Sequence, residues 1–168
     1  MPHASHRISL FIVPRDPEHE LGEGHVAQLR ETLCKEGILD AQDQAGEHSG
    51  RFVEGGFARF RFDRPPWPVV YGNRLGGYRV QCPHCDANMV TLLDLGLRRW
   101  RNGEGRGVAC ESCSREFCIE ALRFKPPAAP GRWALVFSRA ESSELKSGVL
   151  ERLGFLCGVP LQTIVVRG

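Results

Sequence analysis

The sequence predicts an α+β fold in which two strand–helix–strand halves are separated by an inserted, cysteine-bearing segment. Two observations carry this prediction: the chain opens with an apolar run and an amphipathic helix, and it closes with the same succession. A third is that four of the seven cysteines fall in two close pairs between these halves. A chain of 168 residues fits one domain with such an insertion, and its 42% apolar and 25% charged residues are ordinary for a folded globular protein.

The first half begins with a short apolar strand over residues 8–13, which Pro14 and Pro17 bring to an end. An amphipathic helix ending near Gly37 follows; its apolar positions at i, i+3 and i+7 are Val26, Leu29 and Leu33. After a polar loop at 40–50, a strand or hairpin is predicted over 52–63, because apolar and charged residues alternate there. The apolar set is Ala58, Phe60 and Phe62, and the charged set is Arg59, Arg61 and Asp63. The proline-rich stretch 64–68 cannot join a sheet ladder and marks a boundary.

The second half repeats this order, with a strand at 133–138 and a helix for which Ser142 or Ser143 is the expected N-cap. The apolar positions of this helix are Leu145, Val149, Leu150, Leu153 and Leu156. Gly158 and Pro160 end it before a last strand at 163–166. Two such units predict an α+β sandwich, with ferredoxin-like topology as one way to build it. Residues 1–71 and 126–168 would then form one discontinuous domain, with 72–125 as the insertion.

The paired cysteines predict a metal site. The segments CPHC (82–85) and CESC (110–113) are separated by 24 residues. Two residues between cysteines let a tight turn direct both sulfurs to one ion, and two such turns complete the tetrahedral shell that structural zinc prefers. We therefore expect Cys82, Cys85, Cys110 and Cys113 to bind one structural Zn²⁺. An ion with four cysteine ligands has no open position for water and should not be catalytic.

This segment resembles the zinc-ribbon class, whose knuckles typically read C-P-x-C-G. The resemblance covers residues 78–122 and extends to the metal ligands rather than to a particular family, because Asp86 and Ser114 replace the usual glycine after each pair. It implies that the knuckles lie on β-hairpins. Residues 78–81 before the first pair and 117–124 after the second can supply the strands.

The remaining cysteines and one histidine are candidate spare ligands. His84 occupies an x position of its knuckle, which generally points away from the metal, so we expect it to be exposed. Cys118 lies in an apolar stretch and is interpreted as a small core residue. Cys34 and Cys157 lie on or at the ends of the two amphipathic helices, where packing is the usual role of an unpaired cysteine.

CPHC also resembles the active-site motif of thioredoxin-like disulfide oxidoreductases. In that class a strand leads to the cysteines at a helix N-terminus, which lowers the pKa of the first thiol. Val159-Pro160 is similar to the Val/Ile-Pro loop of these enzymes. Against this alternative, it leaves the second C-x-x-C pair unexplained, no signal peptide leads to an oxidising compartment, and Pro160 would follow a long helix rather than a strand.

The charge distribution bears on the partner. Residues 1–50 carry 4 Lys/Arg and 9 Asp/Glu, a net of −5, whereas residues 51–125 carry 13 and 8, a net of +5. Zinc bound to four thiolates adds a formal −2, which leaves about +3 in the middle. The candidate partner-binding residues are Arg98, Arg99, Trp100 and Arg101, together with Arg59 and Arg61 near Trp67.

Basic and aromatic residues together can hold phosphates and stack on bases, so nucleic acid is one alternative. The other interpretation is a solvated strand face, with Trp100 covering the small core of the ribbon. Because the excess charge is small, a protein partner is favoured over nucleic acid. The sequence predicts no oligomeric state.

Other catalytic motifs are absent from the sequence: it contains no H-E-x-x-H, no Walker loop and no G-x-S-x-G. We therefore expect a non-enzymatic binding or adaptor protein. No apolar run approaches the roughly 20 residues that cross a bilayer, and the N-terminus lacks the pattern of a signal peptide. A cytoplasmic location is expected, where thiols stay reduced and bind metal rather than form disulfides.

Overall fold

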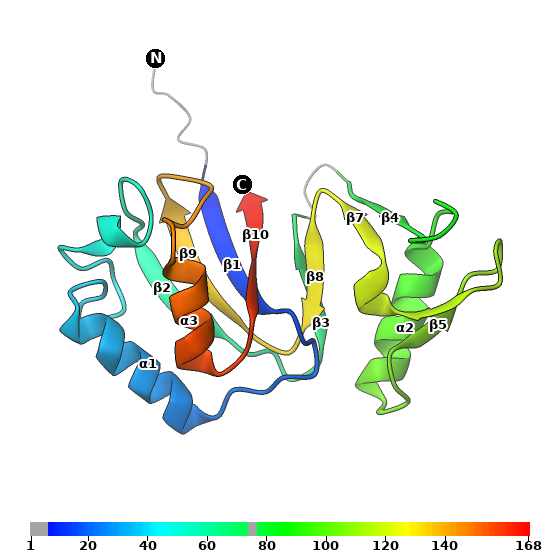
Figure 1. Cartoon of the computed structure of the whole chain (residues 1–168), viewed down its shortest axis with the longest axis horizontal. Helices are drawn as coiled ribbons and strands as arrows, with labels where there is room; N and C mark the ends of the chain where they lie inside the picture. The colour runs from blue at the N-terminus through cyan, green and yellow to red at the C-terminus, as the bar shows by residue number, and fades with distance from the viewer. Residues whose placement is uncertain (1–6, 74–76) are drawn as a thin grey trace, which may run out of the picture.

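The computed structural model describes residues 7–73 and 77–168, and it confirms a mixed α+β fold. A four-stranded antiparallel sheet has the order β10-β1-β9-β2 (Figure 1). Its elements and the two helices between them are β1 (Ile8–Pro14), α1 (Glu23–Lys35), β2 (Arg59–Asp63), β9 (Ala134–Ala140), α3 (Val149–Cys157) and β10 (Leu161–Arg167). No helix in this described part of the chain is long and apolar enough to cross a membrane.

Helices α1 and α3 cover the same face of the sheet and share one core with it (Figure 1). The predicted apolar face of α1 is buried there, and so are Leu153 and Cys157 of α3. The central side chain is Phe137 of β9, which is fully buried and packs its ring against those of Phe52, Phe57 and Phe60. Ring centroids 4.9–6.2 Å apart are the usual range of favourable aromatic contact.

The predicted start of the second helix is wrong. Helix α3 begins after Gly148, whose φ of 82° suits glycine, and no serine caps it. Leu145 lies outside the helix, where it forms a β-bridge with Val53, and the adjacent Lys146 N–H donates to the carbonyl of Phe52 at 2.8 Å. This tertiary pairing holds the chain extended where periodicity alone predicted a helix. Over 52–63, similarly, only Arg59–Asp63 is a strand.

A two-stranded ribbon, β3 (Val69–Gly72) with β8 (Ala128–Gly131), lies between the sheet and the inserted segment (Figure 1). Tyr71 of this ribbon packs on Phe11 of β1, with ring centroids 5.7 Å apart. The ribbon thereby covers part of the sheet face opposite the helices; the buried side chains of this contact are Val13, Tyr71, Ala129, Ala134, Val136 and Ile164.

Beyond the ribbon lies the cysteine module, which we define as residues 77–125. It contains β4 (Arg79–Gln81) paired with β7 (Arg123–Lys125), α2 (Val90–Arg101), and β5 (Gly107–Ala109) paired with β6 (Glu116–Cys118). Short 3₁₀ turns occur at Ser49–Arg51 and at Ile119–Ala121. Val70 packs into the module core and its neighbour Tyr71 into the sheet contact, so the boundary between 71 and 72 stays a prediction.

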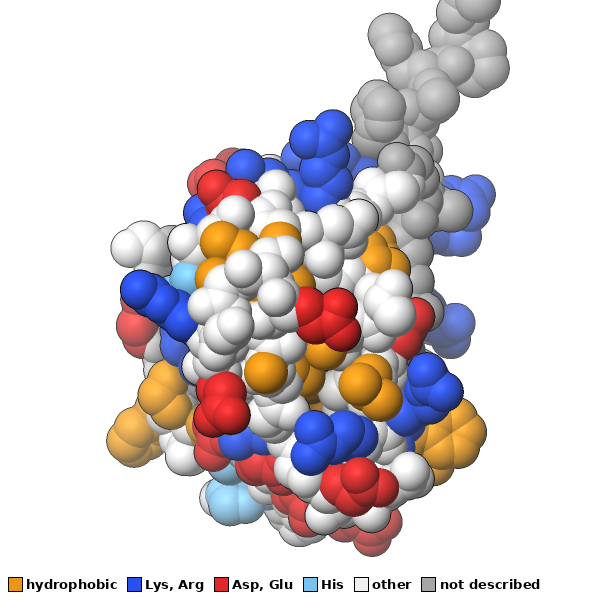
Figure 2. All heavy atoms as spheres, turned by 90° about the vertical axis from the view of Figure 1, so that its right-hand side faces the viewer, with side chains coloured by type: hydrophobic (Ala, Val, Ile, Leu, Met, Phe, Trp, Pro, Cys, Tyr) orange, Lys and Arg blue, Asp and Glu red, His pale blue; other side chains and the backbone are white. Residues whose placement is uncertain are grey.

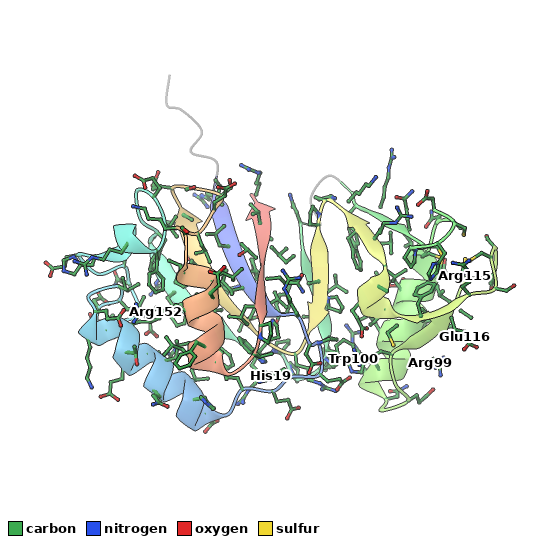
Figure 3. All side chains as sticks on the ribbon, in the orientation of Figure 1. His19, Arg99, Trp100, Arg115, Glu116 and Arg152 are labelled. Carbon is green, nitrogen blue, oxygen red and sulfur yellow. The ribbon has the colours of Figure 1, made fainter. Side chains whose placement is uncertain are left out.

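The module meets the rest of the chain through a charged junction. Glu18 lies 3.1 Å from Arg106 of the module and 3.2 Å from Arg132 next to β9. Both guanidinium groups lie over the ring of Trp100, 5.9 and 5.3 Å from its centroid. Figure 3 shows Trp100 near His19, which accepts a hydrogen bond from the indole of Trp133 at 3.3 Å. These contacts tie the module to the edge of the sheet unit.

Candidate metal centre

The two C-x-x-C segments form the same turn. In the first, the N–H of Cys82 donates to the carbonyl of Ala87 at 2.9 Å, and the N–H of Asp86 donates back to Cys82 at 3.2 Å. In the second, the N–H of Cys110 donates to Arg115 at 2.9 Å and the N–H of Ser114 to Cys110 at 2.8 Å. The first turn follows β4 and the second joins β5 to β6, so each is placed by a short hairpin strand.

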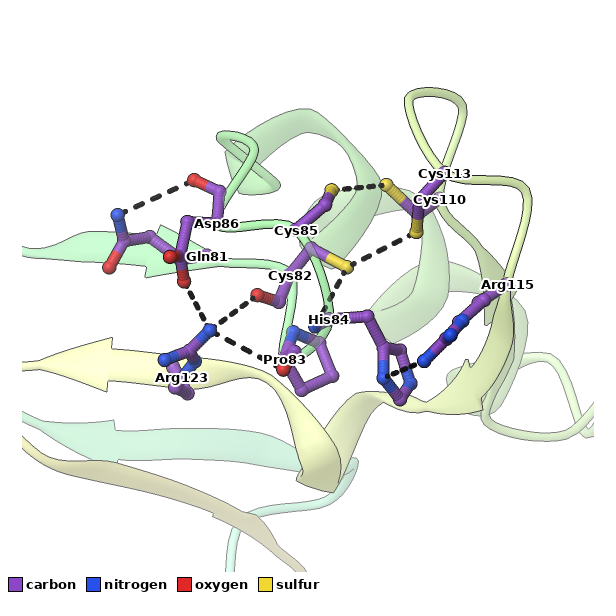
Figure 4. Close-up of polar contacts among 10 residues, drawn as sticks. All are labelled: Gln81, Cys82, Pro83, His84, Cys85, Asp86, Cys110, Cys113, Arg115 and Arg123. Atoms are coloured by element: carbon purple, nitrogen blue, oxygen red, sulfur yellow. Dashed lines mark hydrogen bonds and ion pairs between the residues drawn. The ribbon is translucent and has the colours of Figure 1, made fainter.

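The two turns bring their four sulfurs together (Figure 4). The Sγ atoms of Cys82 and Cys113 are 3.8 Å apart, those of Cys85 and Cys110 are 3.6 Å apart, and all four lie within 4.8 Å of one another. A tetrahedral ion with metal–sulfur bonds of about 2.3 Å separates its sulfurs by about 3.8 Å. The cluster could therefore hold one metal ion with little movement.

The electrostatics of the cluster fit a cation. Hydrogen bonds from the backbone N–H groups of Cys113 and Ser112 lower the pKa of the Cys110 thiol to about 7, although burial acts in the opposite direction. The backbone N–H of Ala87 acts in the same direction on Cys85, but burial and the hydrogen bonds to the three other thiols raise the pKa of Cys85 to about 12. Four crowded thiols cannot all ionise unless a positive charge balances them.

Neighbouring groups hold the first turn in place. Arg123 of β7 donates to the carbonyls of Cys82 and Pro83, both at 3.3 Å, and pairs with the carboxylate of Asp86 (Figure 4). The backbone N–H of His84 lies 3.4 Å from the sulfur of Cys82, as expected when a knuckle amide donates to a thiolate. Strand β7, 40 residues further along the chain, is thus part of the site.

Asp86 and Ser114, which replace the usual knuckle glycines, both have a φ of 62°. The turn therefore keeps its left-handed residue although the side chain makes that conformation unfavourable. Asp86 is compensated by Arg123, whereas the exposed side chain of Ser114 makes no hydrogen bond among the described residues. This difference makes Ser114 a site of removable strain.

We predict that Ser114→Gly raises the stability of the module by up to about 1 kcal/mol. The substitution removes a left-handed penalty of about 1–2 kcal/mol. This gain is partly offset because glycine increases the entropy of the unfolded chain, which costs about 0.4–1 kcal/mol. Ser112→Gly in the same turn, where φ is not positive, is the matched control and should be destabilising. Thermal unfolding of the metal-loaded proteins measures both. Equal losses in the two variants would contradict the proposed turn geometry.

The candidate spare ligands lie outside the sulfur cluster. His84 is exposed as predicted, and its Nδ1 lies 3.1 Å from a guanidinium nitrogen of Arg115 (Figure 4). Cys118 is also exposed, so its interpretation as a core residue is wrong: it lies on the outer side of the β5–β6 hairpin. Cys157 is buried as predicted, but Cys34 is exposed and lies 3.4 Å from the carbonyl of Asp40.

The candidate partner-binding arginines do not form one surface. Arg59 and Arg61 lie on β2, far from α2, which carries the other four residues (Figure 1). Trp100 is only 3% exposed and belongs to the module core. Arg99 donates to the carbonyl of Gly107 and pairs with Glu104, and Arg101 donates to Pro68 and lies over Trp67.

Helix α2 itself was not predicted. Its buried side chains and the one preceding it, Met89, Leu93, Leu97 and Trp100, recur every three or four residues, which is the signal that reveals it. Gly96 lets the helix approach the hairpin, because a Cβ there would lie 2.6 Å from Ile119 and 3.0 Å from Val108.

No family model matches this chain, and no curated protein or solved structure is significantly similar to it.

Proposed function

We propose that Cys82, Cys85, Cys110 and Cys113 bind one Zn²⁺ and that this ion is structural. The observation that carries the proposal is the repeated turn, which directs four sulfurs to one point at distances suited to a tetrahedral ion. Four thiolates are the preferred ligands of structural zinc, and they leave no position for a reacting water. The small core of the module supports this role, because a unit of this size commonly depends on a metal for stability.

The sheet that carries the module is, we infer, of ferredoxin-like topology. Its two units, β1-α1-β2 and β9-α3-β10, supply the sheet order β10-β1-β9-β2 with both helices on one face. On this inference the cysteine module is an elaboration of the connection between the second and third strands. A rigid sheet would then present the module on the β3–β8 ribbon.

The chain as a whole is a non-enzymatic binding or adaptor protein, and a protein partner is favoured. The outer side of α2 offers Leu95, 46% exposed, beside Arg98, which has no side-chain partner among residues 7–73 and 77–168. Figure 2 shows basic, acidic and scattered hydrophobic side chains mixed on the end of the molecule formed by the module. Such a mixed surface supports protein docking more than the tracking of phosphates.

A nucleic-acid-binding zinc ribbon is the first alternative. It would use the arginines of α2. Arg99 and Arg101 already make contacts within the chain, whereas Arg98 has no side-chain partner among the described residues. One unpaired arginine on α2 gives weak support to a phosphate-binding helix.

A thioredoxin-like oxidoreductase is the second alternative, and three observations weigh against it. Cys82 is fully buried, whereas a redox nucleophile is accessible. Helix α2 begins at Val90, after the CPHC turn has closed, so no helix N-terminus is available to acidify the first thiol. The sulfur of Cys82 lies next to that of Cys113, which the redox interpretation leaves without a role.

The class of partner is tested by Arg98→Ala and Leu95→Asp, with Arg15→Ala as a control for loss of an exposed arginine elsewhere. For a protein partner, any affinity of the α2 surface for single-stranded DNA and RNA should stay at the non-specific level of about 10⁻⁴–10⁻⁶ M at physiological salt. Arg98→Ala should therefore bind both nucleic acids as the wild type and the control do. Leu95→Asp should abolish capture of a protein retained by the wild type while zinc content is unchanged. Sub-micromolar binding of nucleic acid that requires Arg98 would instead establish the alternative.

A further inference from the structure

A second feature of the chain lies far from the cysteines, on the sheet face opposite α1 and α3. The β3–β8 ribbon covers this face around Val13 and Ile164 and leaves the part next to β2 open. There the strands and the loop before β2 enclose a hollow of about 660 Å³. Its lining residues are Gln42, Asp43, Gln44, Ala58, Arg59, Phe60, Arg61, Ser138 and Arg139.

A β-bulge in β9 supplies one of these arginines. Phe137 and Ala140 both belong to the core beneath the helices, although regular alternation would place residues three apart on opposite faces. The pairing of β1 with β9 shifts at the same point, between Ile8 and Ser9, so one residue is extra. Arg139 is that residue, and its φ of 52° is unusual for a side chain of this size. As a result Ser138 and Arg139 line the same hollow instead of facing opposite ways.

The charges of the hollow are unbalanced toward positive. Arg59 and Arg139 make no ion pair within residues 7–73 and 77–168, and Arg61 lies 4.0 Å from Asp63, at the limit of an ion pair. The one carboxylate of the lining, Asp43, is held 2.9 Å from Arg30. The amide side chains of Gln42 and Gln44 add neutral donors and acceptors at the rim.

We propose that this hollow binds the phosphate group of a nucleotide, either free or within a nucleic-acid strand. Guanidinium groups match phosphate oxygens by two parallel hydrogen bonds, and three arginines line this hollow. Arg59 and Arg139 are the main candidates, because the guanidinium of Arg61 lies over the ring of Phe11, 5.8 Å from its centroid. The volume lies within the range of small-ligand sites, about 300–1,000 Å³. Arg139 lines the hollow from a residue with positive φ, and backbone strain of this kind is concentrated at ligand-binding sites. The proposed site involves neither the zinc nor the α2 surface, so its test is independent of the proposed function.

The experiment compares four proteins: wild type, Arg59→Ala, Arg139→Gly, and Arg15→Ala as a control at the opposite end of β1. Each is titrated by calorimetry with inorganic phosphate, with adenosine monophosphate and with a short single-stranded oligonucleotide, against chloride at constant ionic strength. Glycine suits the positive φ of Arg139, so Arg139→Gly should not lower the thermal stability. A purely structural role for Arg139 would predict the opposite.

The proposal expects each of the two hollow variants to weaken binding about tenfold or more, as loss of a charge-assisted hydrogen bond does, and Arg15→Ala to bind like the wild type. Arginine-dependent binding of phosphate and the mononucleotide identifies a free ligand, whereas such binding of the oligonucleotide alone identifies a strand. Equal affinities in all four proteins, or no binding of any of the three probes, would overturn the site.

Discussion

Replacing Cys82 by serine is expected to remove the bound zinc and unfold the cysteine module. A serine hydroxyl stays protonated at neutral pH and cannot replace a thiolate ligand. The core that would remain is small and includes Cys82 and Cys110 themselves among its buried residues. Structural zinc contributes about 10–16 kcal/mol to the folding of zinc-finger peptides, so the loss should exceed what that core supplies. Metal content and the near-ultraviolet circular dichroism of buried Trp100 measure the effect.

Cys118→Ser is the matched control, because Cys118 lies in the same module but is exposed and outside the sulfur cluster. It should keep both the metal and the dichroism of the wild type. Cys34→Ser, at another exposed cysteine, should do the same. Serine at buried Cys157 should cost about 1–3 kcal/mol by burying a hydroxyl, without loss of zinc. If Cys82→Ser retained the wild-type fold and metal content, the assignment of Cys82 as a ligand would be wrong.

Phe137→Ala should have the largest effect outside the module, a loss of about 3–5 kcal/mol in the free energy of unfolding. The side chain is fully buried at the centre of the sheet–helix core, and truncation would remove its contacts with three aromatic rings. Because the module has its own core, zinc should stay bound under conditions in which the sheet is weakened. Urea unfolding followed by fluorescence, with zinc content measured in parallel, tests both statements.

Phe155→Ala provides the comparison for this substitution. Phe155 is 86% exposed on α3, and its truncation should change the stability by no more than about 0.5 kcal/mol. Similar losses in the two variants would show that the buried aromatic cluster does not hold the sheet together. Simultaneous loss of zinc in Phe137→Ala would show that the module cannot fold apart from the sheet, against the predicted division of the chain.

The parts predicted correctly depend on local patterns. The clustering of the four paired cysteines follows from their spacing, and the helix at Val26, Leu29 and Leu33 from its period; all three of those side chains are buried. The missed helix α2 carried the same kind of signal. No helix was expected over its segment, because the resemblance to a zinc ribbon implies hairpins.

Other features depend on contacts distant in sequence and could not be predicted. Leu145 is held in a β-bridge by Val53, 92 positions away, so helix α3 starts later than its apolar pattern suggests. Arg139 faces the hollow because a register shift between β1 and β9 inserts one extra residue. The left-handed conformation at Asp86 and Ser114 has a local cause instead: the knuckle turn imposes it, although neither residue type favours it as glycine does.

The most direct measurement of the central claim is the metal content of the protein purified without added metal. One tetrahedral site predicts about one zinc per chain, bound by the wild type and by Cys118→Ser and absent from Cys82→Ser and Cys110→Ser. The four ligand thiols should also be protected from alkylation until a chelator is added. Protein that is folded, contains no metal and has all four of these thiols freely reactive would contradict the account.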